Sequence, residues 1–199
     1  GTDIVGQTEG SLHGSFARHL SVAGMAQSGV QGRGVLVDLL RVFGPERRIV
    51  GLTDLLAVMT AQGIEVRQGD IVMLRTGYAA ALLDMQSAPD PEALDRFGAV
   101  LDGTDEALKR WISDSRIAAI AADNFAVENP HLTPDDCCFR LPLHHHCLFK
   151  LGMPLAELWY LRDLAEALAQ RGRNAVFLTA PPLRLPGAIG SPVTPVATI

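Results

Sequence analysis

The chain has 199 residues, 48% of them hydrophobic, which is enough to bury a sizeable core and fits one domain rather than two. Its 17 basic and 22 acidic residues give a net charge of -5, and no Lys/Arg run could follow a phosphate backbone, so we expect no nucleic-acid partner. There is no uninterrupted apolar window of about 18 residues, and the start lacks the basic and apolar regions of a signal peptide, so we expect a cytoplasmic protein with no membrane contact.

The predicted elements alternate between strands and helices along the chain. Short apolar runs bounded by Gly, Asp or Pro predict buried strands, and apolar residues at helical spacing predict amphipathic helices. In chain order they are an irregular Gly-, Ser- and Gln-rich segment at 1–32, a strand at 35–40, a helix around 52–59, a strand at 71–74, a helix around 104–112, a strand at 117–122, a helix around 161–168, a strand at 176–179, and an irregular Pro/Gly-rich segment at 183–199. This alternation predicts an α/β fold in which residues 1–199 form a single domain.

Polar residues and glycines suggest where the predicted helices begin and end. Thr53 or Asp54 is a candidate N-cap of the first helix, and Gly63 is its expected end. Thr104 is the candidate cap of the second helix, and the third is expected to stop near Gly172.

Three adjacent histidines form the most unusual local feature. His145 lies in the middle of the run Leu143 to Cys147, and Glu157 follows it by twelve residues. Imidazole and carboxylate groups are ligands that Zn²⁺ or Mn²⁺ accepts. A helix ending near Gly152, followed by a turn at Pro154, would bring Glu157 back towards the face that carries His145. Successive helical side chains point about 100° apart, so at most one or two of these histidines could bind one ion. The alternative is that one histidine is a core residue and the others are solvated.

A second group of polar residues follows the strand predicted at 117–122. Ligand sites in open α/β sheets gather at the carboxyl ends of strands, which makes Asp123 and Glu128 candidates for a site. Asp123 and Asn124 could equally be turn residues whose side chains bind the local backbone. The cysteines Cys137, Cys138 and Cys147 lack the spacing of a zinc site or a disulfide framework, and we expect them to be small buried hydrophobic residues.

Five motifs together resemble the putative cyclase family, which includes kynurenine formamidases and isatin hydrolases. They are Arg33 to Asp38, Gly69 to Gly77, Asp123 to Glu128, His145 to Leu158, and Gly190 to Val193. The resemblance runs over residues 32–199. It implies a swivelling β/β/α fold with a mixed sheet and flanking helices, assembly into homodimers or homotetramers, and a divalent metal, Zn²⁺ or Mn²⁺, that activates water against the carbonyl of a small-molecule substrate.

The resemblance also assigns metal ligands. A histidine and a glutamate at the twelve-residue spacing are ligands in the family, and they map onto His145 and Glu157. The family's other ligands come from an upstream motif, His-x-Gly-Thr-His-x-Asp-x-x-x-His, which is incomplete here. Aligning the Gly-Thr of that motif with the first two residues places Asp3 at a histidine ligand position and Glu9 at the catalytic histidine. Keeping Asp3 as the aspartate instead places Gly1 and Gln7 at histidines, and neither alignment restores the set. The family's first strands would lie upstream of Gly1.

The resemblance therefore implies a hydrolase or cyclase acting on a small amide, lactam or ester. His145 and Glu157 would hold the metal with Asp3 as a third ligand, and Glu9 would accept the proton. The remaining candidate residues would shape the substrate pocket; they are Asp123, Asn124, Glu128 and Ser191. Because the upstream motif is incomplete, the alternative is a member of the family that has lost catalysis and acts as a binding or structural oligomeric protein.

Overall fold

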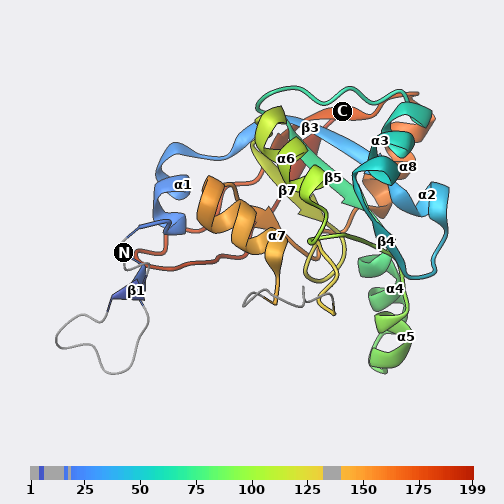
Figure 1. Ribbon diagram of the computed structural model, residues 1–199, viewed down its shortest axis with the longest axis horizontal. Coiled ribbons are helices and arrows are strands. Elements are labelled where there is room, and N and C mark those ends of the chain that lie inside the picture. The colour runs from blue at the N-terminus through green and yellow to red at the C-terminus, as the bar shows by residue number, and fades with distance from the viewer. Residues whose placement is uncertain (1–4, 7–15, 18, 132–139) are drawn as a thin grey trace. The chain divides into compact units, whose positions relative to one another are not determined.

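The computed structural model describes residues 5–6, 16–17, 19–131 and 140–199 (Figure 1). The chain divides into two compact units. The larger unit comprises Arg33–Val176 with Ile199, and the smaller unit comprises Gly1–Gly32 and Phe177–Thr198. The prediction that residues 1–199 form one domain stays a prediction.

The larger unit is built on parallel strands. Each strand of the main set pairs in parallel with the next one, and a separate short parallel pair lies beside the helices. The main set consists of β3 (Gln31–Asp38), β5 (Ile71–Arg75), β7 (Ala119–Ala122) and β8 (Leu155–Ala156), and the separate pair consists of β4 (Arg48–Val50) and β6 (Ala99–Leu101). Nearly every residue of β5 and β7 is buried, as expected for parallel strands covered on both faces.

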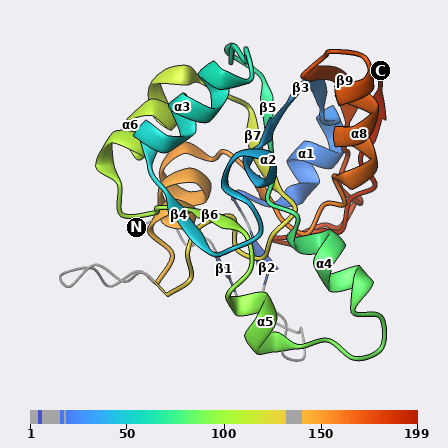
Figure 2. The ribbon, with the colours of Figure 1, turned by 90° about the vertical axis from the view of Figure 1, so that its right-hand side faces the viewer.

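Helices connect these strands. They are α2 (Leu39–Phe43), α3 (Leu52–Ala61), α4 (Tyr78–Asp84), α5 (Pro91–Asp95), α6 (Glu106–Ser115), α7 (Pro142–His144), the π-helix η1 (His145–Leu151) and α8 (Arg162–Gln170). Figure 2 shows α3 and α6 side by side. The helices predicted around 52–59, 104–112 and 161–168 are confirmed as α3, α6 and α8. The strand predicted at 35–40 ends earlier, because the Asp38 side chain accepts a hydrogen bond from the Arg41 amide and starts α2.

The first turns of α3 and α6 are both held by Asp105. Its carboxylate accepts hydrogen bonds from two amides in the first turn of α6, at 2.8 and 3.2 Å, and from the Leu52 amide at the start of α3, at 2.8 Å. The predictions that Thr53 or Asp54 caps α3 and that Thr104 caps α6 are therefore wrong. Asp105 is the ordinary N-cap of α6, one residue after the predicted Thr104, whereas its contact with α3 comes from a distant part of the sequence and is not revealed by local patterns.

Replacing Asp105 by Ala should lower the free energy of unfolding by about 1–2 kcal/mol, because two helices lose their cap. Thr104→Ala, which changes the neighbouring residue, should lower the free energy of unfolding by less. The hydrogen bond from Leu52 is the main reason that the pKa of Asp105 lies below 3.8; burial opposes it, and the α6 amides add to it. The carboxylate's contribution to stability is thus present above that pH and is lost as the pH falls through the folded-state pKa. Urea unfolding of both variants at neutral and acid pH measures the difference; equal losses would contradict this role.

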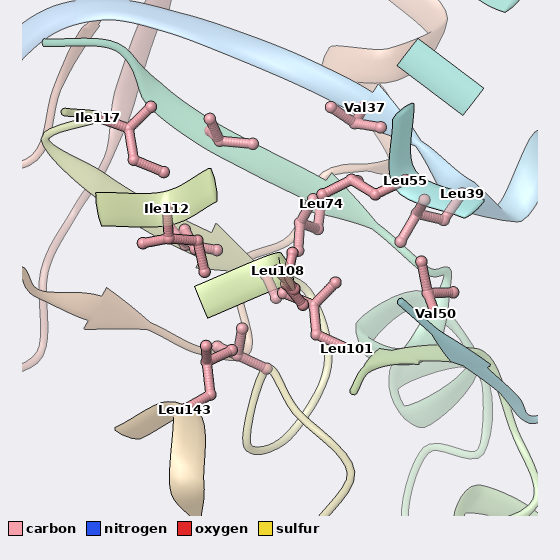
Figure 3. Packing of buried hydrophobic residues seen from close by; sticks show 14 of the residues in the cluster. Val37, Leu39, Val50, Leu55, Leu74, Leu101, Leu108, Ile112, Ile117 and Leu143 are labelled. Carbon is pink, nitrogen blue, oxygen red and sulfur yellow. The ribbon is translucent and has the colours of Figure 1, made fainter. Parts of the chain in front are cut away.

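The core of the larger unit lies between the parallel strands and the helices α3 and α6. Figure 3 shows Leu108 and Ile112 of α6 among Leu74, Leu101 and Leu143. Each of these side chains is at most 2% exposed. Leu143 comes from α7, so the same core fixes the segment that carries the three histidines.

The smaller unit contains short antiparallel strands and one helix. Strand β1 (Val5–Gly6) pairs with β2 (Phe16–Ala17), and β9 (Ala175–Thr179) pairs with β10 (Val196–Thr198). The first two residues of β9 belong to the larger unit. The helix is α1 (Val22–Ser28). Ser21 caps α1 by accepting a hydrogen bond from the Ala23 amide at 3.2 Å. This helix lies within the stretch expected to be irregular. The predicted α/β class, with parallel and antiparallel strands and flanking helices, is confirmed. Within the described residues, none of the helices has the length and apolar character needed to span a membrane.

Candidate functional site

Two buried polar side chains hold the loop that follows β7. The Asp123 carboxylate accepts hydrogen bonds from the Thr76 amide at 2.7 Å, from the Thr76 hydroxyl at 2.6 Å and from the Gly77 amide at 2.7 Å. Asn124 donates to the Ala99 carbonyl at 2.9 Å. Burial raises the pKa of Asp123, and the hydrogen bonds oppose that rise. Only Asn124 also binds the local backbone, by accepting a hydrogen bond from the Val127 amide at 3.1 Å, so the turn interpretation holds for Asn124 and not for Asp123, whose partners are distant in sequence. A role for either residue in a substrate pocket stays a prediction.

The chain then turns sharply towards the interior. Ala126 and Val127 have φ angles of 73° and 58°, in the left-handed region that residues other than glycine seldom adopt. The Glu128 amide donates to the Ala126 carbonyl within this turn. Leu158, which follows Glu157, is also left-handed, with a φ of 56°. Backbone strain of this kind is typical of functional sites, and here it adjoins two carboxylates that approach the same histidine.

Glu128 is fully buried and caps the helix that carries the histidines. One carboxylate oxygen accepts a hydrogen bond from the Leu143 amide at 2.9 Å, and the other accepts one from the His144 amide at 2.8 Å. Both amides lie in the first turn of α7, where no intrahelical acceptor exists, and Pro142 at the start needs none. The Glu128 carboxylate can approach these amides because residue 103 is glycine: a Cβ atom there would lie 1.8 Å from the Glu128 Oε2 atom.

His144 lies between two carboxylates. Its Nδ1 atom is 2.9 Å from Glu128 Oε1, and its Nε2 atom is 3.1 Å from Glu157 Oε1. Burial lowers the pKa of His144, but the hydrogen bonds and charges of the two glutamates outweigh it and raise that pKa to about 9. The contact with His144 in turn lowers the pKa of Glu157, against burial and with help from a backbone hydrogen bond at Ala126. Glu157 is therefore an ionised acceptor at neutral pH.

The three adjacent imidazoles have three different neighbours. His144 contacts Glu157, the His145 ring stacks on Phe149 with a centroid distance of 5.4 Å, and His146 Nε2 lies 2.9 Å from Ser113 Oγ. This divergence agrees with the angular spacing expected for successive helical residues. The contact with Glu157 is made by His144. The prediction that His145 and Glu157 share a metal ion stays a prediction.

The donor atoms at His144 and Glu157 fit a divalent cation. Two ligands of a tetrahedral Zn²⁺, each at about 2.0–2.2 Å from the ion, lie roughly 3.3–3.6 Å apart, so the observed 3.1 Å between Nε2 and Oε1 needs to widen by only a few tenths of an ångström to admit the ion. Glu128 on the other ring nitrogen completes the arrangement in which a carboxylate orients a ligating histidine. Across residues 19–131 and 140–199 and the short described strands, no three His, Cys, Asp or Glu side chains are grouped to hold a metal. The described residues thus supply a pair of ligands rather than a full set.

Three further predicted site residues are Asp3, Glu9 and Ser191. Asp3 and Glu9 lie outside the described residues. Ser191 belongs to the smaller unit, where its hydroxyl accepts a hydrogen bond from the Leu183 amide at 2.9 Å and donates to the Pro192 carbonyl at 2.7 Å. The roles predicted for these residues stay predictions.

Cys147, on the same π-helix, is completely buried. Burial, helped by the charge of Glu128, raises the pKa of its thiol to about 12, so it remains protonated. It behaves as the small buried hydrophobic residue that the sequence predicted. Cys137 and Cys138 lie outside the described residues.

Two features of the site were missed by sequence reasoning. The contact of His144 with Glu157 was not predicted, because the spacing to Glu157 alone cannot distinguish adjacent histidines. Gly103 was not considered, although a glycine just after a strand often marks a close approach of backbone or side chain.

Comparisons with known proteins point to one family. The model of the putative cyclase family matches residues 7–129, a stretch that includes Glu128 and ends before His144 and Glu157. No curated protein matches the sequence.

Solved structures extend the similarity beyond this stretch. A protein described as a novel cyclase is 33% identical, with a TM-score of 0.74, over 90% of this chain and 56% of its own. Isatin hydrolase A from Ralstonia solanacearum is 18% identical, with a TM-score of 0.62, over 89% of this chain and 63% of its own. A potential metal-dependent hydrolase with cyclase activity is 19% identical, with a TM-score of 0.56, over 96% of this chain and 72% of its own.

The last two similarities establish a shared fold only. The chain spans 56% of the length of the novel cyclase, so the activity of a whole relative does not transfer to it directly. The family match covers more than half of the sequence, and the identity to the novel cyclase extends over nearly all of it. The chain belongs to the putative cyclase family.

Proposed function

We propose that this chain serves in the metal-dependent hydrolysis of a small amide, lactam or ester, and that His144 and Glu157 hold the cation, Zn²⁺ or Mn²⁺. The observation that carries the proposal is the 3.1 Å separation of His144 Nε2 and Glu157 Oε1, with Glu128 on the opposite ring nitrogen. The similarity in fold to an isatin hydrolase and to a potential metal-dependent hydrolase supports the same chemistry. When bound, the cation would supply Lewis-acid activation of water and of the substrate carbonyl.

The chain's own residues have distinct tasks in this proposal. Glu128 engages His144 Nδ1 and holds Nε2 towards Glu157, and a cation would take the place of the proton that these two atoms share. Glu157 stays ionised because His144 and the Ala126 backbone stabilise its charge. Asp3 would be the third ligand and Glu9 the proton acceptor, as the sequence resemblance implies.

Metal removal tests the proposed function. The purified chain should take up about one equivalent of Zn²⁺ or Mn²⁺ per site, and its hydrolysis of N-formyl amides or lactams such as isatin should vanish after chelation and return when the metal is restored. Elemental analysis and a spectrophotometric hydrolysis assay give the two readouts. A chain that takes up no metal after soaking would instead be a non-catalytic binding or structural member of the family.

A further inference from the structure

We infer that Glu128 is a positioning residue that fixes the start of helix α7 and the orientation of the His144 ring with one buried carboxylate. The inference rests on the proposed function, in which His144 is a ligand. It assigns to Glu128 a task different from the substrate-pocket role implied by the sequence resemblance.

The first support is the way in which Glu128 uses its two oxygens. Oε2 accepts from the Leu143 amide at 2.9 Å, while Oε1 accepts from the His144 amide at 2.8 Å and lies 2.9 Å from His144 Nδ1. The main chain and the ring of His144 are therefore tied to the same oxygen. A rotation of the ring about its bond to the backbone would break the Nδ1 contact and carry Nε2 away from Glu157.

The second support is that the surroundings leave the carboxylate no other position. Glu128 is 0% exposed, and Gly103 provides space that any side chain would fill. On the other side, the left-handed backbone of Ala126 and Val127 sets the direction in which Glu128 leaves the chain. A carboxylate held this firmly orients its partner more precisely than a solvent-exposed one could.

The third support is that the site requires a carboxylate and not merely a polar group. Three donors converge on two oxygens, and both oxygens must accept. A glutamine has one accepting oxygen and one donating NH₂ group, so it would face a backbone N–H or the imidazole with a second donor. With the glutamine oxygen towards His144, the Leu143 amide at the start of α7 loses its acceptor; with the NH₂ group towards His144, both the His144 amide and the ring lose theirs.

The experiment measures Co²⁺ or Zn²⁺ affinity in the Glu128→Gln variant. Affinity should fall about 10- to 100-fold, the usual effect of losing a group that orients a ligating histidine. Glu128→Asp keeps both accepting oxygens on a shorter side chain, so its metal affinity should lie between those of the wild type and Glu128→Gln. In the zinc-loaded protein, the proton resonance of the His144 ring N–H, identified by its loss in His144→Ala, should lie downfield in the wild type and move upfield in Glu128→Gln.

A matched control separates positioning from general loss of structure. Asp70 is another buried carboxylate, 2% exposed, which pairs with Arg33 at 2.8 Å and accepts from the Arg67 amide at 2.7 Å. Asp70→Asn should lose stability without losing metal affinity. If it loses affinity to the same extent as Glu128→Gln, the inference is overturned.

Two further results separate the proposed metal site from the proposed role of Glu128 in it. A wild-type chain that binds no Co²⁺ or Zn²⁺ contradicts the proposed function itself. A wild-type chain that binds, together with a Glu128→Gln variant that binds within about threefold of it and keeps the downfield resonance, overturns the positioning role alone. Should Glu128→Gln fail to fold, a Glu128→Asp variant that binds as tightly as the wild type and keeps the downfield resonance overturns the positioning role.

Discussion

Replacing His144 by Ala should reduce metal-dependent hydrolysis by about 10²-fold or more, since the Lewis-acid contribution of a bound metal amounts to several kcal/mol of barrier. His144 Nε2 is the imidazole nitrogen that faces Glu157 Oε1, at 3.1 Å. Without the ring, the buried Glu128 carboxylate also loses one of its donors. Both effects weaken the same site, so metal affinity should fall together with turnover.

The neighbouring histidine provides the control for this variant. The His145 ring stacks on Phe149, so His145→Ala should retain most of the metal affinity and activity. Titration calorimetry and the hydrolysis assay on both variants, with circular dichroism to verify folding, distinguish the two residues. A larger loss in His145→Ala than in His144→Ala would mean that the ligand is the histidine at the twelve-residue spacing.

Replacing Leu143 by Ala should lower the free energy of unfolding by about 3–5 kcal/mol. The side chain is 0% exposed and packs in the cluster that includes Leu108 and Ile112, so its loss leaves a cavity under the start of α7. A loss of this size is a large part of the total stability of a typical domain, about 5–15 kcal/mol. Since the Leu143 amide also donates to Glu128, movement into the cavity should disturb the site.

Leu148→Ala is the matched control on the same π-helix. Leu148 is 40% exposed, so its truncation should cost less than about 1 kcal/mol. Chemical denaturation of both variants measures the difference. Similar losses in the two variants would mean that Leu143 does not anchor the helix in the core.

Much of the fold was predictable because its central elements have strong local signals. The buried runs at 71–74 and 117–122 became β5 and β7, and helical spacing located α3, α6 and α8. The short strands β4 and β6, of three residues each, were missed because runs of that length carry no periodicity. The cap of α3 was misassigned because Asp105 is 53 residues from Leu52 in sequence and acts through the tertiary fold, whereas the cap of α6 was misplaced by one residue.

The region of the chain that carries the site was predictable, but the contacts of its individual residues were not. The sequence pointed correctly to the histidine run, to Glu157 and to Glu128 as parts of one region. It could not indicate that His144 contacts Glu157, because that contact depends on the π-helix and strand β8 that separate the histidines from Glu157. Nor could it indicate that Ala126 and Val127 adopt left-handed conformations, since neither residue type favours them.

The location of a bound metal tests the account most directly. Crystals of the chain soaked in a zinc salt should give an anomalous difference peak at about 2.0–2.2 Å from His144 Nε2 and from a Glu157 carboxylate oxygen. Glu128 should remain on His144 Nδ1 in the same crystals. A peak bound to the His145 ring, or soaked crystals in which His144 and Glu157 share no ion, would contradict the assignment of these two residues as the metal ligands.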